Sequence, residues 1–206
     1  MTCKPTFEKV LARELGAYGW KADIGGAGWV MAKLSGSYPD ICFAEIGGED
    51  PVEISASSAN GLTSDLVDLF MDRLKNSRVD EPWPLMFASV GHDASLLKRV
   101  KTIRAAWLKK TKKILPRVMK LAREEMTGEC PARRGFFVYI TDFTRAFVSL
   151  SARFGGQRRM RMDSNAPSRS YLKIEEAYGI LGCQPAKGET VIDLGAAPGG
   201  WSYSAL

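Results

Sequence analysis

Apolar residues recur at helical spacing in several stretches of the chain, and this pattern predicts four helices before residue 130. Their expected ranges are 7–15, 62–74, 95–114 and a shorter one from Pro116 to about Met126. Thr6 is a candidate N-cap of the first helix, and Gly16 is a candidate stop. The third helix is amphipathic, with apolar residues on one face and lysines on the other. Its inward positions are Leu96, Leu97, Val100, Ile103, Trp107 and Leu108.

Shorter apolar runs, alternating or continuous, predict strands between and after these helices. The expected strands span residues 28–34, 41–46, 84–90, 135–141, 146–154 and 190–192. The strands at 135–141 and 146–154 flank the turn from Asp142 to Arg145, and they therefore predict a hairpin. Mixed helices and strands of this kind indicate an α/β (α+β) protein.

Four parts follow from this order of elements. We expect a small α/β unit, ferredoxin-like, at residues 1–54 and a second α/β domain at 55–154. Residues 155–166 lack a periodic apolar pattern and are interpreted as a linker. Residues 167–206 make up the fourth part.

Charge is unevenly distributed along the chain. The net charge is +6, but the stretch from Lys98 to Arg169 holds 19 Lys or Arg against 5 Asp or Glu, and the remainder is net acidic. A concentrated positive field attracts a polyanion, and nucleic-acid phosphates are the usual partner. A solvated basic face without a partner is the alternative interpretation.

Cysteine, histidine and hydropathy patterns exclude several classes of protein. Cys3, Cys42, Cys130 and Cys183 form no Cys-x-x-Cys pair, and His92 is the only histidine, so neither a zinc site nor a disulfide framework is expected. No apolar run is long enough to span a bilayer, and residues 1–5 lack the apolar core of a signal peptide. We therefore expect a cytoplasmic protein with no metal and no membrane partner.

The most informative stretch is a glycine-rich turn near residue 200. Asp193 closes the expected strand at 190–192, and a turn rich in glycine leads into a helix expected near Trp201. Glycines allow backbone N–H groups to approach a nucleotide-like ligand closely. The spacing G-x-x-x-G-G matches neither the dinucleotide fingerprint nor the P-loop, and the phosphate-binding lysine of the P-loop is missing.

The sequence Asp193-Leu-Gly-Ala-Ala-Pro-Gly-Gly-Trp201 resembles the first motif of the FtsJ-like ribose 2′-O-methyltransferases. The resemblance implies that S-adenosyl-L-methionine lies against this turn. The cofactor-binding residues that it implies are Asp193, Gly195, Ala196, Ala197, Pro198, Gly199, Gly200 and Trp201. A tight turn in an unrelated α/β protein is the alternative, because motif matches carry false positives.

A second stretch, residues 166–177, is similar to the helix that precedes this motif in the same family. Pro167 and Ser168 mark a helix start, with Ser168 or Ser170 as the N-cap. The resemblance makes Lys173 the first member of a Lys-Asp-Lys-Glu catalytic set. A lysine suits this task because it can orient a ribose 2′-OH, a poor nucleophile, or accept its proton. The alternative is a solvated helix lysine paired with Glu176.

Two further stretches resemble a narrower group, the RlmM-type ribose 2′-O-methyltransferases of bacterial large-subunit (23S) rRNA. They are Cys3–Glu8, similar to a C-R-P-G-F-E opening, and the junction from Asp163 to Glu176. The order of a strand, a basic helix, a helix and paired strands resembles a THUMP domain, an RNA-binding module. The phosphate contacts that this implies are Lys109, Lys110, Lys112, Lys113, Arg133 and Arg134, with Arg158, Arg159 and Arg161 continuing the positive track.

The expected function is S-adenosylmethionine-dependent 2′-O-ribose methylation of large-subunit rRNA by a longer parent enzyme. Residues 167–206 have room for one helix, one strand and the first turn of another helix, whereas a doubly wound sheet needs several β-α units. The resemblance therefore implies that residues 167–206 are the incomplete start of a Rossmann-like domain. We expect an N-terminal fragment that supplies RNA binding and the first cofactor motif. A non-catalytic RNA-binding module is the alternative, and a DNA-binding protein is less favoured.

Overall fold

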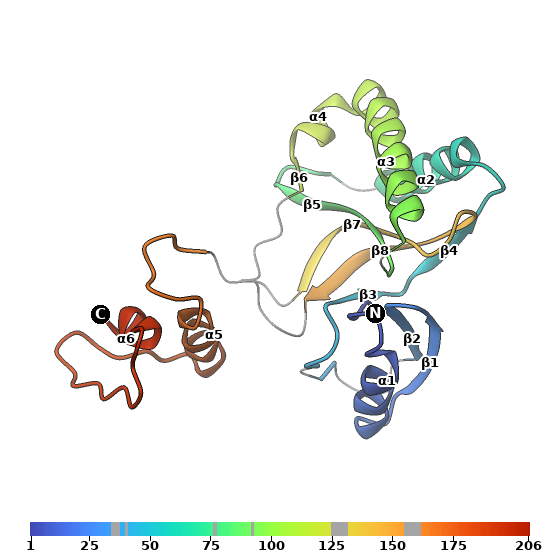
Figure 1. The fold of residues 1–206 in the computed structure, drawn as a ribbon. Coiled ribbons are helices and arrows are strands. Elements are labelled where there is room, and N and C mark those ends of the chain that lie inside the picture. The colour runs from blue at the N-terminus through green and yellow to red at the C-terminus, as the bar shows by residue number, and fades with distance from the viewer. Residues whose placement is uncertain (34–37, 40, 76–77, 92, 125–131, 155–161) are drawn as a thin grey trace. The chain divides into compact units, whose positions relative to one another are not determined.

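The computed structural model describes residues 1–33, 38–39, 41–75, 78–91, 93–124, 132–154 and 162–206 (Figure 1). The chain divides into two compact units, residues 1–156 and residues 157–206. The expected linker therefore falls largely outside the described residues. Arg158, Arg159 and Arg161 lie there too.

The first unit begins with a helix and a hairpin. Helix α1 (Glu8–Ala17) is followed by the antiparallel strands β1 (Lys21–Gly26) and β2 (Trp29–Lys33). Strand β2 confirms the strand expected at 28–34, whereas β1 was not expected. Leu11 and Leu15 of α1 are fully buried. The expected stop at Gly16 is wrong by one residue. The chain leaves the helix through Gly19, whose φ of 79° favours glycine.

The strand expected at 41–46 is wrong, because only Ile46 of that range is in a strand. The backbone N–H groups of Cys42 and Phe43 donate instead to the carboxylate of Glu14 in α1, at 2.7 and 3.0 Å. A helix side chain thus accepts the hydrogen bonds that the carbonyl groups of a neighbouring strand would otherwise accept. Ile41 and Ala44 pack in a small core with α1.

A mixed sheet forms the centre of the first unit (Figure 1). Its strand order is β3-β8-β7-β5-β6, and β4 also pairs with β8. β5 runs parallel to both β6 and β7, and the other pairs are antiparallel. The strands are β3 (Ile46–Glu49), β4 (Val52–Ser55), β5 (Trp83–Ser89), β6 (Ala122–Arg123), β7 (Ala132–Ile140) and β8 (Arg145–Phe154). The sheet therefore takes strands from both sides of residue 54, and the ferredoxin-like arrangement of residues 1–54 stays a prediction.

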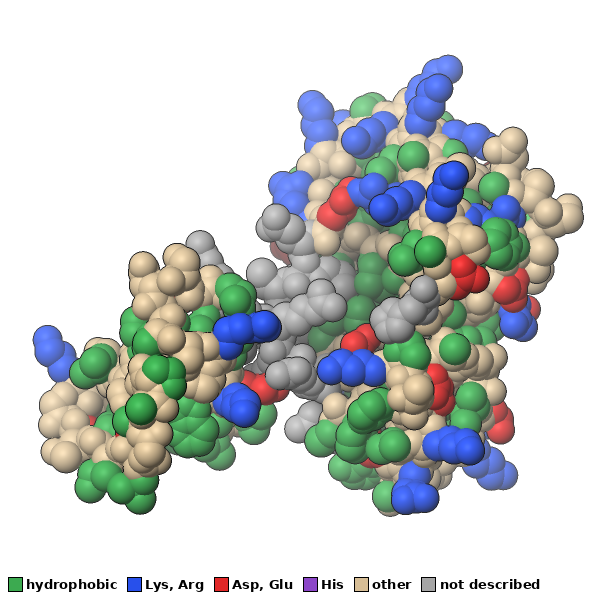
Figure 2. Space-filling view, viewed as in Figure 1, with side chains coloured by type: hydrophobic (Ala, Val, Ile, Leu, Met, Phe, Trp, Pro, Cys, Tyr) green, Lys and Arg blue, Asp and Glu red, His purple; other side chains and the backbone are tan. Residues whose placement is uncertain are grey.

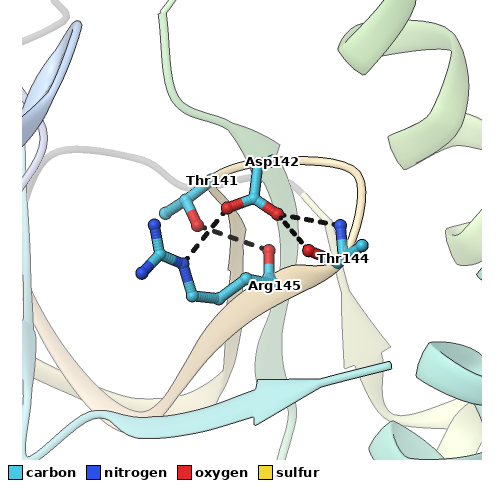
Figure 3. Close-up of polar contacts among 4 residues, drawn as sticks. All are labelled: Thr141, Asp142, Thr144 and Arg145. Atoms are coloured by element: carbon cyan, nitrogen blue, oxygen red, sulfur yellow. Dashed lines mark hydrogen bonds and ion pairs between the residues drawn. The ribbon is translucent and has the colours of Figure 1, made fainter. Parts of the chain in front are cut away.

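The expected hairpin is confirmed as β7 and β8, and Asp142 organises its turn. One carboxylate oxygen of Asp142 accepts hydrogen bonds from the backbone N–H and the hydroxyl of Thr144, both at 2.8 Å (Figure 3). Its other oxygen accepts from Nε of Arg145 at 3.2 Å. Aspartate favours such turns because its side chain can bond the backbone two residues on.

Two helices, α2 (Ala59–Leu74) and α3 (Ala94–Ile114), pack on one face of this sheet and confirm the two longest predicted helices (Figure 1). The side chains of Ser58 and Asp93 cap them. Their apolar faces meet the sheet around Trp107 and Phe136, whose rings stack at 5.3 Å. Strand alternation places Val138, Ile140 and Val148 on the same face.

The helix expected from Pro116 to about Met126 is shorter than predicted. Helix α4 (Pro116–Lys120) ends before β6, because Ala122 pairs with Trp83 of β5. The indole of Trp83 also donates to the carbonyl oxygen of Val118 at 3.0 Å. These contacts with β5 replace further helical turns.

The other face of the sheet carries Phe137, Tyr139, Phe147 and Ala152, and Trp29 of β2 packs against them. The ring centroids of Trp29 and Phe147 are 5.4 Å apart. The helix-and-hairpin part of the unit therefore covers the face that α2 and α3 leave open. In the second unit, the described residues form two helices and no strand.

Candidate methyl-donor site and basic surface

The candidate site in the second unit begins with helix α5 (Tyr171–Leu181), which confirms the helix expected after Pro167. Ser170 occupies the N-cap position, but neither serine side chain makes the predicted capping bond to the helix. The hydroxyl groups of Ser168 and Ser170 instead bond one another at 2.6 Å. Lys173 lies exposed in the first turn, and its backbone N–H donates to the carbonyl oxygen of Ser170.

The buried strand expected at 190–192 is wrong, since these residues form neither a strand nor a buried segment. Val191 is 47% exposed, Ile192 79% and Leu194 90%. A β-branched run becomes a strand only when a neighbouring strand accepts its backbone hydrogen bonds. The described residues of this unit offer no such strand.

The glycine-rich turn itself leads into a helix, as predicted. Helix α6 (Gly200–Ala205) starts one residue before Trp201. Asp193 holds that start, because its Oδ2 accepts hydrogen bonds from the backbone N–H of Ser202 at 3.1 Å and from its hydroxyl at 2.8 Å. Gly195 and Gly199 have φ of 79° and 92°, which residues with a Cβ rarely adopt. The peptide bond between Ala197 and Pro198 is cis.

A close contact joins the start of α5 to the start of α6. A Cβ built on Gly200, which is buried, would lie 2.2 Å from Oγ of Ser170 and 2.5 Å from Oγ of Ser168. The indole Nε1 of Trp201 donates to the carbonyl oxygen of Ser170 at 3.1 Å. The structure thus brings the two sequence motifs together at their serines, Gly200 and Trp201.

A second set of contacts ties the segment before α5 to both helices. The Tyr171 hydroxyl accepts from the backbone N–H of Asp163 at 2.5 Å, and the Tyr203 hydroxyl donates to Oδ2 of Asp163 at 2.7 Å. The two tyrosine rings meet edge to face at 6.0 Å. The hydrogen bond to Asp163 raises the pKa of Tyr203.

Sequence reasoning missed this junction. Ser168 and Ser170 were expected to cap a helix, and instead they line the space beside Gly200. Gly200 was the sequence signal for this contact. The turn needs glycine at 195 and 199 for their positive φ, whereas Gly200 is helical and buried, so its backbone conformation does not explain it. A glycine in that position indicates close packing by a neighbour.

In the first unit, the C-terminal half of α3 presents the predicted phosphate contacts. Lys109, Lys110, Lys112 and Lys113 are all exposed. Figure 2 shows Lys and Arg side chains gathered over the region of α3 and α4. Nζ of Lys110 donates to the hydroxyl of Ser64 at 3.0 Å, so this lysine has a neighbour within the protein. Lys112 and Lys113 also lie at the helix C-terminus, where positive charge is favourable without any ligand.

The structure describes only some of the remaining predicted basic contacts. Arg134 is exposed on β7, and the backbone of Arg133 lies in the same strand. Arg104 of α3, which was not among the predicted contacts, forms an ion pair with Glu124, and this pair lowers its availability to a phosphate. The arrangement therefore puts the lysines of α3 ahead of the other basic side chains as candidate contacts.

Two searches of the described residues concern other classes of site. Among them, no three His, Cys, Asp or Glu side chains come together in a group that could hold a metal ion. In the same part of the chain, every helix is too short or too polar to cross a membrane.

Comparison with known proteins gives matches at two scales. The model of the family described as FtsJ-like methyltransferase matches residues 166–206, which include α5, the glycine-rich turn and α6. A protein of Halorhodospira halophila, named ribosomal RNA large subunit methyltransferase M, is 42% identical over 89 residues, covering 40% of this chain and 26% of the relative. A protein of the same name from Shewanella sp. is 27% identical over 224 residues, covering 98% of this chain and 61% of the relative.

The chain thus spans less than two thirds of the length of these relatives. Among solved structures, a possible methylase from Clostridium difficile 630 matches with a TM-score of 0.41 and 17% identity, over 73% of this chain and 39% of that one. The sequence matches show that the chain is similar to proteins named ribosomal RNA large subunit methyltransferase M, and that its similarity to the FtsJ-like methyltransferases lies at residues 166–206.

Proposed function

We propose that this protein takes part in the S-adenosylmethionine-dependent 2′-O-ribose methylation of large-subunit rRNA in the cytoplasm. Residues 1–156 supply RNA binding, and residues 157–206 supply the first cofactor motif and one catalytic lysine. The observation that carries the proposal is the junction at Gly200, which joins two segments that both lie within the FtsJ-like match.

The turn from Asp193 to Trp201 suits the methionine end of the cofactor. Between Gly195 and Gly200 no side chain is larger than a proline ring, so a ligand can approach the backbone N–H groups closely. Asp193 uses Oδ2 to hold α6, and among the described residues Oδ1 accepts no hydrogen bond. That oxygen is therefore able to accept from an ammonium group, while backbone amides of the turn meet the carboxylate.

Lys173 would act on the ribose. When bound, the cofactor supplies an electrophilic methyl group on a sulfonium, and the 2′-OH must be oriented toward it. Lys173 follows Ser170 by three residues, so the contact of Ser170 with Gly200 and Trp201 fixes the first turn of α5 next to the glycine-rich turn. From this position the amine of Lys173 is suited to orient the ribose 2′-OH or to accept the proton of that hydroxyl.

The exposed lysines of α3 would bind RNA phosphates. Such contacts are blind to sequence and position the RNA rather than select the nucleotide. The names of the relatives support ribosomal RNA as the nucleic acid. The concentration of positive charge between Lys98 and Arg169 supports a polyanion of any kind.

The alternative function is that of an RNA-binding module without catalysis. The separation of the chain into two units favours it, because residues 1–156 form a compact unit by themselves. The two functions differ in one observable, which is the transfer of a labelled methyl group.

The test uses the protein expressed from its complete reading frame, labelled S-adenosylmethionine and large-subunit rRNA that lacks ribose methylation. Label is expected in the RNA, and alkaline digestion should leave it in a dinucleotide because a 2′-O-methyl group blocks cleavage at that ribose. Label in a mononucleotide would show methylation of a base and contradict the 2′-O assignment. Tight RNA binding without any transfer would support the binding module.

A further inference from the structure

A cavity of about 360 Å³ lies in the first unit, on the face of the sheet opposite α2 and α3. Its walls come from the β1–β2 hairpin with its flanks, from β3 and from the hairpin β7–β8. This volume is in the range of small-molecule sites and is large enough for a purine or pyrimidine ring. The cavity shares none of its lining residues with the basic surface of α3.

Aromatic side chains form much of the wall. Trp29 and Phe147 lie on one side with their ring centroids 5.4 Å apart, and Trp20 and Tyr38 meet edge to face at 5.4 Å. Flat aromatic surfaces stack on unpaired nucleic-acid bases, and each stacked base contributes substantially to binding. Tyr139 is the fifth aromatic residue of the lining, and a cavity of this composition suits a planar, uncharged ring.

The floor of the cavity holds two buried hydroxyl groups. Within the described residues, neither the hydroxyl of Tyr139 nor that of Ser149 has a hydrogen-bond partner. Burial raises the pKa of Tyr139, so its hydroxyl stays protonated and able to donate. A Cβ built on Gly48 would lie 2.4 Å from Oγ of Ser149 and 3.1 Å from Cε2 of Tyr139, which places both side chains beneath the same glycine.

Unpaired hydroxyl groups in a protein interior are uncommon, and each one has an energetic cost. A hydroxyl both donates and accepts, and the edge of a nucleobase offers acceptors and donors side by side. Gly48 keeps the approach to these two groups free of a side chain.

Charge in the lining argues against phosphate as the group that enters. Lys33 lines the cavity together with Glu49 and Asp50. Glu49 is neutralised by Arg153, whose Nε donates to it at 2.5 Å, and Asp50 offsets Lys33. A phosphate would therefore find no excess of positive charge, whereas a neutral ring would not be repelled.

We propose that this cavity binds one unpaired base of single-stranded RNA, held between the aromatic walls with its edge at Tyr139 and Ser149. The inference rests on the proposed function for the identity of the nucleic acid. It adds a site that reads a flipped-out or single-stranded nucleotide, separate from the phosphate contacts of α3.

The test measures binding of the 206-residue chain to the four nucleoside 5′-monophosphates and to hexamers of a single nucleotide, with inorganic phosphate and ribose 5-phosphate as controls. At least one base is expected to bind, and its hexamer is expected to bind more tightly than the monomer. Binding of ribose 5-phosphate equal to that of the nucleotides would overturn the proposal. A monomer that binds more tightly than every hexamer would indicate a free nucleotide and overturn the RNA assignment.

The decisive variant is the double substitution Y139F/S149A. It removes two hydroxyl groups that lack a hydrogen-bond partner among the residues that the structure describes, so the melting temperature should stay unchanged or rise. Binding of the preferred hexamer should weaken about tenfold, the effect of one or two lost hydrogen bonds. A double variant that binds as tightly as the original chain would refute the site, as would the absence of binding by every base.

A control pair of substitutions separates this site from the basic surface. Changing Lys112 and Lys113 to Gln should weaken binding of the hexamer without changing which base the chain prefers. A failure of methyl transfer by the complete protein would overturn the proposed function and leave base binding by the chain unaffected. The two proposals therefore fail independently.

Discussion

The Cα of Gly200 lies so close to Ser170 that a side chain at position 200 would reach within 2.2 Å of the serine hydroxyl. This contact joins the glycine-rich turn to the helix that carries Lys173. The position of Lys173 relative to the turn thus depends on the absence of one methyl group.

The substitution Gly200→Ala tests this contact. The new Cβ would force Ser168 and Ser170 to rotate away, which breaks their mutual 2.6 Å hydrogen bond, and it would still press on the backbone N of Tyr171 at 3.1 Å. We expect a loss of about 1–3 kcal/mol in the second unit, as for other overpacked sites. Amide hydrogen exchange in α5 and α6 should become faster, with no change in residues 1–156.

The serines provide the rescue. In a variant that combines Gly200→Ala with S168A/S170A, both hydroxyl groups are gone and much of the lost protection should return. If the triple variant exchanges as fast as Gly200→Ala alone, the clash does not involve the serines.

The lysines of α3 give a second prediction. Neutralising Lys109, Lys112 and Lys113 with Gln should weaken RNA binding and flatten its dependence on salt concentration by up to about three ions, because the slope follows the number of phosphates neutralised. Lys110 is left in place since it already donates to Ser64. Binding measured from about 50 to 200 mM salt checks the slope.

A matched control changes the same amount of charge elsewhere. Lys4, Lys9 and Lys21 are exposed on the helix-and-hairpin part of the first unit. Their triple Gln variant should keep a slope close to that of the original chain. Equal slopes for the two triple variants would show that binding responds to net charge alone, and the RNA path would have to be sought elsewhere.

The ion pair of Glu49 with Arg153 predicts a dependence of stability on pH. Hydrogen bonds from Arg153 and Ser151 hold the pKa of Glu49 below its usual range. A carboxylate with a lowered folded-state pKa stabilises the protein fully above its unfolded pKa of about 4.3, and this contribution disappears as pH falls through the folded pKa. Glu49→Gln should therefore lower the melting temperature at pH 7, by an amount worth about 1 kcal/mol or less because the pair is partly exposed.

The change of this effect with pH distinguishes the loss of the ion pair from a general loss of packing. At about pH 3 the difference between Glu49→Gln and the original chain should be smaller than at pH 7, since this pH lies below the unfolded pKa of about 4.3, where the contribution of Glu49 declines. Glu53→Gln, at an exposed carboxylate on the neighbouring strand, should change the melting temperature little at either pH. A Glu49→Gln difference of equal size at both values would contradict the electrostatic origin.

Local patterns predicted the elements that are stabilised by their own residues. The periodic apolar residues of α2 and α3 and the turn at Asp142 each carry their signal within one stretch, and the structure confirms them. Two elements that depend on a distant partner were missed or wrong, although β5 was predicted and pairs with the distant strand β7. The two-residue strand β6 exists because Ala122 meets Trp83, and the strand expected at 190–192 is absent because no strand lies beside it among the described residues of that unit.

The same distinction applies to the sites. The motif from Asp193 to Trp201 specified a turn followed by a helix, and it did so through glycines that the backbone requires at 195 and 199. It could not show that Asp193 accepts a hydrogen bond from Ser202 of α6 or that Gly200 packs on two serines, because these contacts cross from one segment to another. The aromatic cavity has no sequence signal, since Trp20, Trp29, Tyr139 and Phe147 come from separate strands or loops.

The role of Lys173 separates catalysis from binding. In the complete protein, Lys173→Ala should abolish methyl transfer to rRNA while leaving RNA affinity within a few fold. The reason is that an exposed lysine of α5 that orients the 2′-OH contributes to the reaction rather than to RNA binding. Lys187→Ala removes an equally exposed lysine of the same unit and should leave transfer unchanged. Transfer and binding are measured on the same preparations. Weakened binding with normal transfer at saturating RNA would make Lys173 a phosphate contact, because a general base or orienting group must affect the rate once the substrate is bound.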